Sequence, residues 1–370
     1  MSFASLKSQL LPLARKLDLI VSKLPRVGNF RPLRGNFSAA EALAERRIEG
    51  GFLTHSQDLG PCPPGSVTDR AGMQQHNHQP WPVFWTRADD AQLVGKMLHW
   101  RNPENYLCSE GLFQTPQRHH LRQDRFFAQI IVKSPERLPG AWTSIVSNWG
   151  NGGNYYHWML DSLTRLLVRE HLPEETRILI PANTPPFVAE TIKMLGITHL
   201  TQTAPSSCVQ PERFYFCSPT AMTGVWNPMG CEWLREKFAC FRQTTGNGRP
   251  IFLTRRGATR IPPNLGEIEA IFSQNGFEII DCGKHTVKEQ IRLASSAPAI
   301  AGLHGAAMTN ILWAQPNTPV LEIFQPEYLN ACYEQIAFQG KLDYQFLIID
   351  PSSDKNKLRH WISQATGMTP

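Results

Sequence analysis

The sequence lacks several signals that would each have pointed to a particular class of protein. None of its eight cysteines stands in a CxxC pair, so zinc ligation by cysteine pairs is not expected, and reduced, buried thiols in a cytosolic protein are the plain interpretation. No GxSxG segment is present, which removes the nucleophile elbow that a serine hydrolase would need. No window approaches the run of about eighteen apolar residues that a membrane-spanning helix requires.

An excess of one sign of charge is found only in the N-terminal arm, which we define as residues 1–35. Residues 1–34 contain seven Lys and Arg against the single acid Asp18, and this difference of +6 equals the formal net charge of the whole chain. Because the remainder is balanced, nucleic-acid binding is disfavoured. Leucines between these bases predict an amphipathic helix attracted to an anionic membrane surface, and a solvated arm packed on its own domain is the alternative. We expect a cytoplasmic protein, with peripheral contact at the inner membrane face under the first interpretation.

The length and composition predict two domains. A chain of 370 residues with 41% apolar and 18% charged residues is too long for one ordinary core and has a normal globular composition. Residues 36–120 are rich in Pro, His and Trp, which favours short strands and ordered loops over long helices. A break at 243–250 separates a first domain, 36–245, from a second domain, 246–370.

Predicted strands and helices alternate from about residue 125 onward. The strands are expected at 125–133, 142–149, 177–182, 251–257, 278–282, 298–302 and 318–324. The helices are expected at 157–172, 186–197, 264–277, 287–297 and 306–315. This alternation predicts an α/β fold with two Rossmann-like parallel sheets and an irregular, β-containing N-terminal extension. Ligands of such sheets bind at the carboxyl ends of the strands, so two facing sheets create a cleft.

The segment AGLHGAAMTN, residues 301–310, is the sharpest local signal of the second domain. A predicted buried strand runs into Gly302, His304 and Gly305, and small residues then open a helix. Glycine lets backbone amides approach a ligand, and a helix N-terminus favours a diphosphate. The alternative is a tight turn whose glycines serve packing and whose histidine is a hydrogen-bonded core residue. The candidate phosphate-binding residues of this segment are His304, Gly305, Ala306, Thr309 and Asn310.

Three arginines follow the strand IFLT in the segment TRRGATR. Arg255, Arg256 and Arg260 stand at the carboxyl end of that strand, and the fixed fork of arginine suits bidentate contacts to phosphate. A solvated charged loop is the alternative. Glu322 ends the apolar strand TPVLE, where a carboxylate can take the two hydroxyls of a ribose or pair with a nearby base.

A histidine and an aspartate open the predicted helix at 157–172. His157 and Asp161 are four residues apart and share a helix face. The pair predicts a general base, Asp161, whose carboxylate is tuned or oriented by the imidazole. An ordinary surface contact between the two side chains is the alternative.

Aromatic residues surround this pair in the stretch GNGGNYYHWMLD. Tyr155, Tyr156 and Trp158 offer flat apolar surfaces of the kind on which sugars stack, and the glycines at 150, 152 and 153 let the backbone approach the cleft. These residues and Asn154 are therefore candidate acceptor contacts. The alternative makes Asn154 a helix cap and Trp158 a core residue.

Three separated blocks carry a resemblance to a known family. The blocks GNYYHWMLDSLTRLL, FLTRRGATRIPPNLGEIEAIFSQNGFEII and EQIRLASSAPAIAGLHGAAMTNILWAQPNTPVLEIF resemble, in order and spacing across roughly 145 to 325, conserved blocks of glycosyltransferase family 61. This family includes bacterial capsular and lipopolysaccharide enzymes, plant xylan-decorating transferases and animal protein O-GlcNAc transferases. The resemblance implies two facing Rossmann-like domains in the GT-B arrangement, a nucleotide-sugar donor, usually a UDP-sugar, and inversion at the anomeric carbon.

The resemblance has one departure. The family often has an acidic residue directly after the Asn that corresponds to Asn264, where this chain has Leu265. Glu267 and Glu269 are the candidates to substitute for that acid.

An inverting transfer is a single in-line displacement, which needs a base for the acceptor hydroxyl and groups that neutralise charge on the leaving diphosphate. We assign the base to Asp161, aided by His157, and the electrophiles to the three arginines and the amides around Gly305. With so many fixed cations, no cofactor is expected, and we predict metal-independent transfer. The adjacent acids Asp89 and Asp90 lie outside the matched blocks and are interpreted as a helix-start feature.

These inferences together predict an enzyme of capsular or lipopolysaccharide biosynthesis. Its first domain is expected on the side of the glycan or glycolipid acceptor, and its second domain is expected to bind the nucleotide-sugar. The alternative is a non-catalytic nucleotide- or sugar-binding subunit of a polysaccharide assembly complex.

Overall fold

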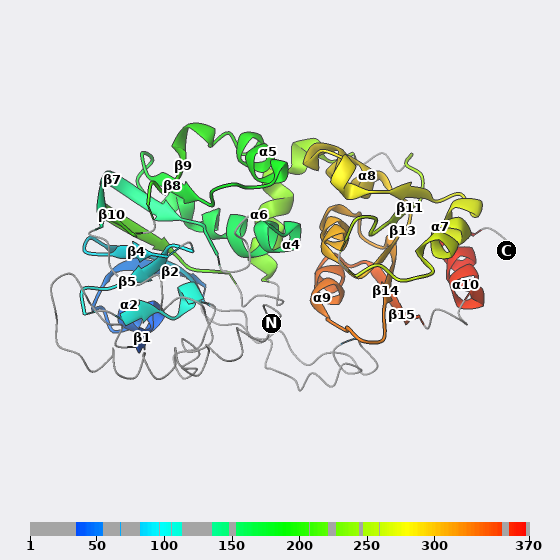
Figure 1. Cartoon of the computed structure of the whole chain (residues 1–370), viewed down its shortest axis with the longest axis horizontal. Coiled ribbons are helices and arrows are strands. Elements are labelled where there is room, and N and C mark those ends of the chain that lie inside the picture. The colour runs from blue at the N-terminus through cyan, green and yellow to red at the C-terminus, as the bar shows by residue number, and fades with distance from the viewer. Residues whose placement is uncertain are drawn as a thin grey trace, which may run out of the picture.

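The computed structural model describes residues 35–54, 67, 82–95, 97–104, 106–112, 135–147, 153–206, 208–220, 227–243, 247–258, 260–349 and 355–367. Two sheets lie side by side, with strands β1–β10 on one side of the molecule and β11–β15 on the other (Figure 1). The predicted α/β fold with parallel strands and helices is confirmed. Residues 1–34, the strand predicted at 125–133 and the glycines at 150 and 152 lie outside the described residues.

The first sheet is mixed and contains ten strands within the described residues. These are β1 (Gly35–Phe37), β2 (Glu49–Thr54), β3 (Val83–Ala88), β4 (Gln92–Val94), β5 (His99–Arg101), β6 (Tyr106–Cys108), β7 (Glu136–Ser144), β8 (Arg177–Ile180), β9 (Thr201–Thr203) and β10 (Cys208–Cys217). Their order is β1-β6-β5-β4-β10-β7-β8-β9, with β3 also paired to β10 and β2 to β3. β10, β7, β8 and β9 are parallel, whereas β10 is antiparallel to β3 and β4. The β-containing extension therefore belongs to the same sheet as the parallel strands.

β10 joins the two parts of this sheet, and the sequence pattern did not predict it. Its apolar run is interrupted by Pro211, Glu212 and Arg213. The pairing with β7 shifts register between Pro211 and Arg213, and Glu212 accepts a hydrogen bond from the backbone N–H of Gly140 at 2.7 Å. This irregularity lets a strand with polar residues in its middle stay paired on both sides.

The helices of the first half are short. They are α2 (Ala39–Ala44), η1 (Glu110–Leu112), α4 (Tyr155–His157), η4 (Trp158–Ser162), η5 (Leu163–His171), α5 (Pro186–Met194), η6 (Thr198–Leu200), α6 (Pro228–Lys237) and η7 (Ala239–Phe241). The helix predicted at 157–172 is present but irregular, because a π-helical turn over η4 precedes a 3-10 segment over η5. The backbone N–H of Leu163 reaches the carbonyl of Trp158, five residues back. Residues 158–168 are buried, so the segment runs through the core.

Within the described part of the chain, the second sheet has five parallel strands in the order β12-β11-β13-β14-β15. The strands are β11 (Ile251–Leu253), β12 (Glu278–Ile280), β13 (Ile300–Leu303), β14 (Pro319–Phe324) and β15 (Asp343–Ile348). The helices are α7 (Leu265–Gln274), η8 (Cys282–Lys284), α8 (Val287–Ser296), η9 (Ala306–Trp313), α9 (Cys332–Gln339) and α10 (Lys355–Thr366). The strands and helices predicted between residues 251 and 324 are all present. Most are shorter than predicted, β13 begins two residues later and ends one residue later, and the helix predicted at 306–315 is a 3-10 helix. α9, β15 and α10 follow them in the chain.

Each face of the second sheet has its own hydrophobic cluster. α7 and α10 cover one face, where Phe252 and Phe272 stack with ring centroids 4.5 Å apart. α8, η9 and α9 cover the other face, and their apolar side chains share a cluster with α4, η4, α5 and α6 of the first half. The two halves are therefore joined by a continuous core.

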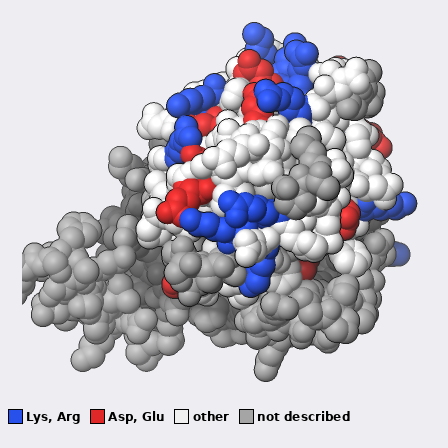
Figure 2. Space-filling view, turned by 90° about the vertical axis from the view of Figure 1, so that its right-hand side faces the viewer, with Lys and Arg blue, Asp and Glu red and all other residues white. Residues whose placement is uncertain are grey.

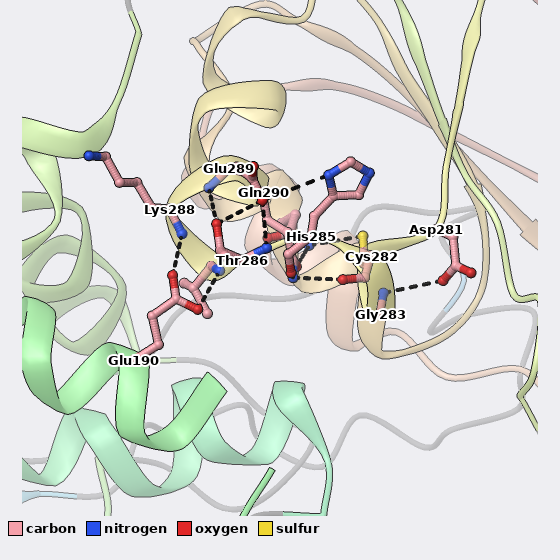
Figure 3. A network of polar contacts seen from close by, with 11 residues as sticks. Glu190, Asp281, Cys282, Gly283, His285, Thr286, Lys288, Glu289 and Gln290 are labelled. Atoms are coloured by element: carbon pink, nitrogen blue, oxygen red, sulfur yellow. Dashed lines mark hydrogen bonds and ion pairs between the residues drawn. The ribbon is translucent and has the colours of Figure 1, made fainter. Parts of the chain in front are cut away.

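A carboxylate from the first half caps a helix of the second half at this junction. Glu190 of α5 accepts hydrogen bonds from the backbone N–H groups of Val287, at 2.8 Å, and Lys288, at 3.0 Å, at the start of α8 (Figure 3). Thr286 and Glu289 complete a capping box at the same helix end. A negative charge at a helix N-terminus is stabilising, so Glu190 helps to hold the two halves together.

Charges of both signs are mixed on one face of the molecule. On the face shown in Figure 2, Lys and Arg side chains are interspersed with Asp and Glu side chains. Asp89 and Asp90 lie in the turn between β3 and β4, not at a helix start as predicted, and Asp89 pairs with Arg87. No helix in the described part of the chain is long and apolar enough to span a membrane.

Candidate functional site

The candidate site begins where the strand order of the second sheet reverses. β12 lies on one side of β11, and β13, β14 and β15 follow on the other side. Such a switch point leaves a crevice outside the carboxyl ends of two strands, where ligands of open α/β sheets bind. Arg255 lies two residues after the end of β11, and His304 directly follows β13. The sheet topology thus brings together residues that are 49 positions apart in the chain.

Arg255 reaches across this crevice to the turn that opens η9. Its Nη1 donates a hydrogen bond to the carbonyl oxygen of His304. A Cβ atom on Gly305 would lie 2.6 Å from Nη1 of Arg255, so a side chain there would displace the guanidinium. Glycine is needed at position 302 for a different reason, because a Cβ atom there would lie 2.9 Å from Cβ of Leu253 on the neighbouring strand. One glycine of the motif therefore admits a charged side chain, and the other permits close packing.

A small pocket opens at this edge of the sheet. The guanidinium carbon of Arg260 lies 3.8 Å from the ring centroid of Tyr328. Nε of Arg255 is buried and has no hydrogen-bond partner among the described residues. Within the same residues, no carboxylate lies within ion-pairing distance of Arg255 or Arg260. The pocket is lined by Arg255, Arg260, Pro262, Leu303, His304, Ile323, Gln325 and Tyr328.

The electrostatics of this pocket favour an anion. The pKa of Arg255 is lowered, first by burial and second by the neighbouring charge of Arg260. Both effects penalise the charged guanidinium, and an anion bound between the two arginines would oppose both. Phosphate oxygens suit this geometry, because arginine binds them through two parallel hydrogen bonds.

Glu322 lies behind His304, not in the pocket. Its side chain is fully buried, Oε1 is hydrogen-bonded to Nδ1 of His304, and Oε2 accepts a hydrogen bond from the hydroxyl of Tyr344. The imidazole stacks on Phe324 with ring centroids 4.9 Å apart. The predicted contact between Glu322 and a ribose does not fit this geometry, because both carboxylate oxygens are engaged in the core.

Arg256 points away from the pocket and pairs with Glu269. Nε of Arg256 donates to both carboxylate oxygens, at 3.0 and 3.1 Å, and Thr254 donates to the same carboxylate. Burial would raise the pKa of Glu269, but hydrogen bonds from Arg256 and Thr254 outweigh burial and lower the pKa. Among the three predicted arginines, only Arg255 and Arg260 line the pocket.

The acids proposed to replace the family's residue after Asn264 are also outside the pocket. Leu265 packs in the cluster beneath α7 and α10. Glu267 is exposed and pairs with Lys355 at 2.9 Å, and Glu269 is held by Arg256. Neither carboxylate therefore takes a place in the pocket.

Two of the predicted phosphate ligands on η9 belong to the core. Thr309 is fully buried, and Asn310 is 1% exposed. The amide of Asn310 donates to Gln290 at 2.9 Å, and its oxygen accepts from the hydroxyl of Tyr155 at 3.5 Å. Ala306 is half-buried at the start of the helix, so only the first turn of η9 remains near the sheet edge.

The predicted pair in the first half is formed. Nδ1 of His157 lies 2.8 Å from Oδ2 of Asp161, and the side chains are 22% and 3% exposed. The pair spans the start of the π-helical turn, an irregularity that is frequent at functional sites. The imidazole is thus the member that a ligand can reach more readily, with the carboxylate behind it.

The aromatic residues around this pair do not offer stacking surfaces. Trp158 is fully buried, and its indole N–H donates to Thr191 at 2.9 Å. Tyr155 is 8% exposed and packs edge-on against Phe187. Asn154 caps α4 by accepting from the backbone N–H of Tyr156. The prediction of sugar stacking on these rings is therefore wrong for this structure, because they fill the junction between the two halves.

Tyr156 connects the two candidate sites. Its ring contacts His157, with centroids 5.2 Å apart, and Tyr333 of α9, with centroids 5.6 Å apart. Tyr333 in turn contacts His304 at 5.3 Å. The two histidines therefore lie at opposite ends of a two-ring bridge across the junction, and the site comprises side chains from both halves.

Arg165 is a buried residue of this region that the sequence analysis did not single out. It is 3% exposed, Nε donates to the carbonyl of Cys217 and Nη1 to that of Val146, both at 2.9 Å. Burial lowers its pKa to about 10, against the raising effects of Cys217, Cys108 and Asp161. Arg165 thus ties η5 to the chain just beyond β7 and to the last residue of β10. Its position one turn after Asp161 in an apolar run was the signal available in the sequence.

The described residues contain no group of three or more His, Cys, Asp or Glu side chains arranged to hold a metal ion. The positive charge of the pocket on β11 and β13 comes from side chains of the protein and from the start of η9.

The two arginines of the pocket at the switch point of the second sheet, and the His–Asp pair of the first half, place candidate functional groups in both halves of an α/β protein. Residues 155–321 match the sequence model of Glycosyltransferase 61. The chain therefore contains a glycosyltransferase 61 domain, which runs from the start of α4 to the middle of β14. The expected family is thereby confirmed, and the matched range includes both His157 and His304.

A plant protein shares part of this sequence. A stretch of 59 residues is 39% identical to beta-1,2-xylosyltransferase of Arabidopsis thaliana. The stretch covers 16% of this chain and 11% of that protein.

Proposed function

We propose that the chain is an inverting glycosyltransferase of the GT-B arrangement that moves a sugar from a nucleotide-sugar donor, a UDP-sugar, to a hydroxyl of a glycan acceptor. The observation that supports this function best is the convergence of Arg255, Arg260 and His304 on one pocket at the switch point of the second sheet. The family match over residues 155–321 supports the same class of reaction.

The donor diphosphate binds in this pocket under our proposal. Arg255 and Arg260 contact its oxygens, and the first amides of η9 add donors at a helix N-terminus. Negative charge accumulates on the diphosphate as the bond to the sugar breaks, so preorganised cations stabilise the transition state more than the ground state. The two arginines supply the charge that a divalent metal would otherwise supply, and we propose that the transfer needs no metal.

The acceptor hydroxyl is activated by the pair in the first half. The burial of Asp161 reverses the roles of base and helper that the sequence suggested for Asp161 and His157. Because His157 is 22% exposed and Asp161 only 3%, we assign proton abstraction to the imidazole and the orientation of the ring to the carboxylate. Inversion requires only one such base, which accepts the proton as the hydroxyl oxygen attacks the anomeric carbon opposite the departing diphosphate.

The acceptor is a glycan or glycolipid, and capsular or lipopolysaccharide biosynthesis is the role we propose. Because the matched plant protein is named a xylosyltransferase, UDP-xylose belongs among the first donors to assay. The proposed location is the cytoplasm, with residues 1–35 at the membrane surface.

The test is a thermal-shift and calorimetric panel with UDP, GDP, CMP and their common sugar conjugates, with manganese or with EDTA. A ligand that binds only the folded state raises the melting temperature by mass action. We expect stabilisation by UDP that EDTA leaves intact and that Arg255→Ala reduces. Absence of a shift with every nucleotide would exclude the donor site. Binding without turnover in the presence of a broad acceptor panel would favour the alternative, a non-catalytic subunit.

A further inference from the structure

A buried carboxylate stands directly behind the histidine of the pocket. Glu322 lies in the middle of β14 and is 0% exposed, whereas His304 lies on the pocket wall. A carboxylate facing a phosphate pocket from within the core repels the ligand unless its charge is compensated. Because its two oxygens are bonded to His304 and Tyr344, Glu322 reaches the pocket only through the imidazole.

The hydrogen bond between Nδ1 of His304 and Glu322 affects whether the other ring nitrogen, Nε2, carries a proton and can donate a hydrogen bond. Nε2 of His304 has no hydrogen-bond partner among the described residues, and it is not among their buried unpartnered atoms. We consider the state in which His304 and Glu322 together hold two protons. One proton is then on Nε2 of His304, and the other lies between Nδ1 and Oε1, on either atom. Burial raises the pKa of Glu322, against the lowering effect of hydrogen bonds from His304 and Tyr344, and so favours a proton on its carboxyl group.

The surroundings of the imidazole limit the alternatives. Phe324 stacks on one side of the ring at 4.9 Å, so rotation about the side-chain bonds is hindered. The groups that face the pair are Arg255 and Arg260 from the segment after β11, Tyr328 from the segment after β14, Tyr333 and Glu334 from α9, and Tyr344 from β15. The two arginines on the pocket side oppose a further positive charge, and a pair that is neutral overall avoids this cost.

We infer that Glu322 is a positioning residue of the donor site, which together with Tyr344 holds His304 so that Nε2–H donates a hydrogen bond to a phosphate oxygen of the bound nucleoside diphosphate. The inference rests on the proposed function, because it names the group that the pocket receives. Under this inference the carboxylate of Glu322 positions His304, and it does not contact a ribose as the sequence suggested. At metal sites, too, a carboxylate hydrogen-bonded to a histidine fixes the orientation of the ring.

A double-mutant cycle on UDP affinity tests the inference. The variants are His304→Gln, Glu322→Met, which keeps the length of the side chain and removes both oxygens, and the combination of the two. Affinities for UDP and for uridine are measured by titration calorimetry. We expect each single variant to weaken UDP binding about tenfold or more, and the double variant to be no weaker than His304→Gln alone. Uridine, which lacks the phosphates, should bind all variants alike.

A purely structural role of Glu322 gives a different result. In that case Glu322→Met weakens UDP and uridine together, and its effect adds to that of His304→Gln, which overturns the inference. Glu110→Met is the matched control, because Glu110 is a buried carboxylate of the first half that caps α2, and UDP affinity should not change. If Glu322→Met does not fold, Tyr344→Phe removes the hydrogen bond to Oε2 and should weaken UDP but not uridine.

The proposed function and this inference fail separately. If the unmodified protein binds no nucleoside diphosphate, the donor site is excluded. Detection of the Nε2 proton of His304 by nitrogen-15 NMR, assigned with His304→Gln, then still reports on the pair. If UDP binds normally but Nε2 carries no proton, or Glu322→Met binds UDP as tightly as the unmodified protein, the positioning role is wrong while the donor site stands.

Discussion

The ring of Tyr156 meets the ring of Tyr333 edge-on, with centroids 5.6 Å apart and planes at 87°. Tyr156 comes from the segment that carries the His–Asp pair, and Tyr333 comes from α9, beside His304. This contact lies between the segment of the proposed acceptor base and the helix beside the proposed donor pocket. A change in either ring should therefore affect both stability and the alignment of the two sites.

Removal of the Tyr156 ring and removal of its hydroxyl should have opposite consequences. The hydroxyl oxygen is buried without a hydrogen-bond partner among the described residues. Tyr156→Phe should leave the free energy of unfolding unchanged or raise it, because an unpaired polar group is removed. Tyr156→Ala should lower it by about 3–5 kcal/mol through cavity formation. Urea unfolding of both variants decides the point, and a large loss in Tyr156→Phe would show that the hydroxyl is engaged.

Arg255 and Arg256 are adjacent in sequence and should differ in function. Arg255→Ala removes a guanidinium from the pocket and should weaken UDP binding by about 1.5–3 kcal/mol, or roughly tenfold to a hundredfold. Arg256→Ala removes the partner of Glu269 and should leave UDP affinity within about twofold of the unmodified protein. Titration calorimetry of both variants provides the comparison. Equal losses would mean that the pocket extends to Arg256.

The His157–Asp161 pair should matter for turnover and not for donor binding. Asp161→Asn keeps the shape of the side chain and should lower kcat by about 10²–10⁴-fold, because the imidazole loses its carboxylate partner. UDP affinity should stay the same. His157→Gln should cause a similar loss, and the double variant should be little worse than either single one, since the two side chains act as a unit. Additive losses would show independent roles, and full activity in both variants would place the base elsewhere.

The ion pair between Glu269 and Arg256 should contribute to stability in a pH-dependent manner. The folded-state pKa of Glu269 is lowered, because hydrogen bonds from Arg256 and Thr254 outweigh burial. A carboxyl group with a lowered pKa stabilises the fold above its unfolded-state pKa, and the contribution is lost as the pH falls from about 5 through the folded-state value. Glu269→Gln should therefore show a shallower decline in the free energy of unfolding between about pH 5 and 3.

Urea unfolding across that pH range measures the decline for each protein. Glu278→Gln is the control, because Glu278 is an exposed carboxylate on the neighbouring strand β12, and its curve should follow the unmodified protein. A parallel decline in Glu269→Gln and the unmodified protein would assign the acid sensitivity to other carboxyl groups.

The elements of the second half could be predicted because local pattern and tertiary environment agree there. The strands β11, β13 and β14 are three to six residues long and apolar except for Glu322 in β14, and the helices between them have apolar positions on one face. Gly196 and Gly276 adopt positive φ angles of 71° and 83° near the ends of the predicted helices and two residues after α5 and α7 end, as expected of residues that end a helix. By contrast, β10 carries Pro211, Glu212 and Arg213 in its middle, and its pairing depends on strands far away in the chain.

The site could be predicted in part for a related reason. His157 and Asp161, or Gly305 and Ala306, are close in the chain, so their proximity follows from local geometry. Whether a polar residue faces a pocket or the core depends on what packs against it, which spacing alone does not reveal. Arg255 and Arg256 illustrate this limit, because the pattern treats them alike, while Glu269 draws one of them away.

The sequence by itself determined the α/β class, the resemblance to the glycosyltransferase 61 family, the His–Asp pair and the location of the glycine turn before η9, because each is set by short-range periodicity or by blocks of adjacent residues. Only the tertiary structure decided that Glu322 supports His304, that Trp158 and Asn310 belong to the core, and that Tyr156 and Tyr333 join the two sites. These roles arise from contacts between segments far apart in the chain. Such contacts depend on how the two sheets and their helices pack, and burial then determines which polar groups are left for a ligand.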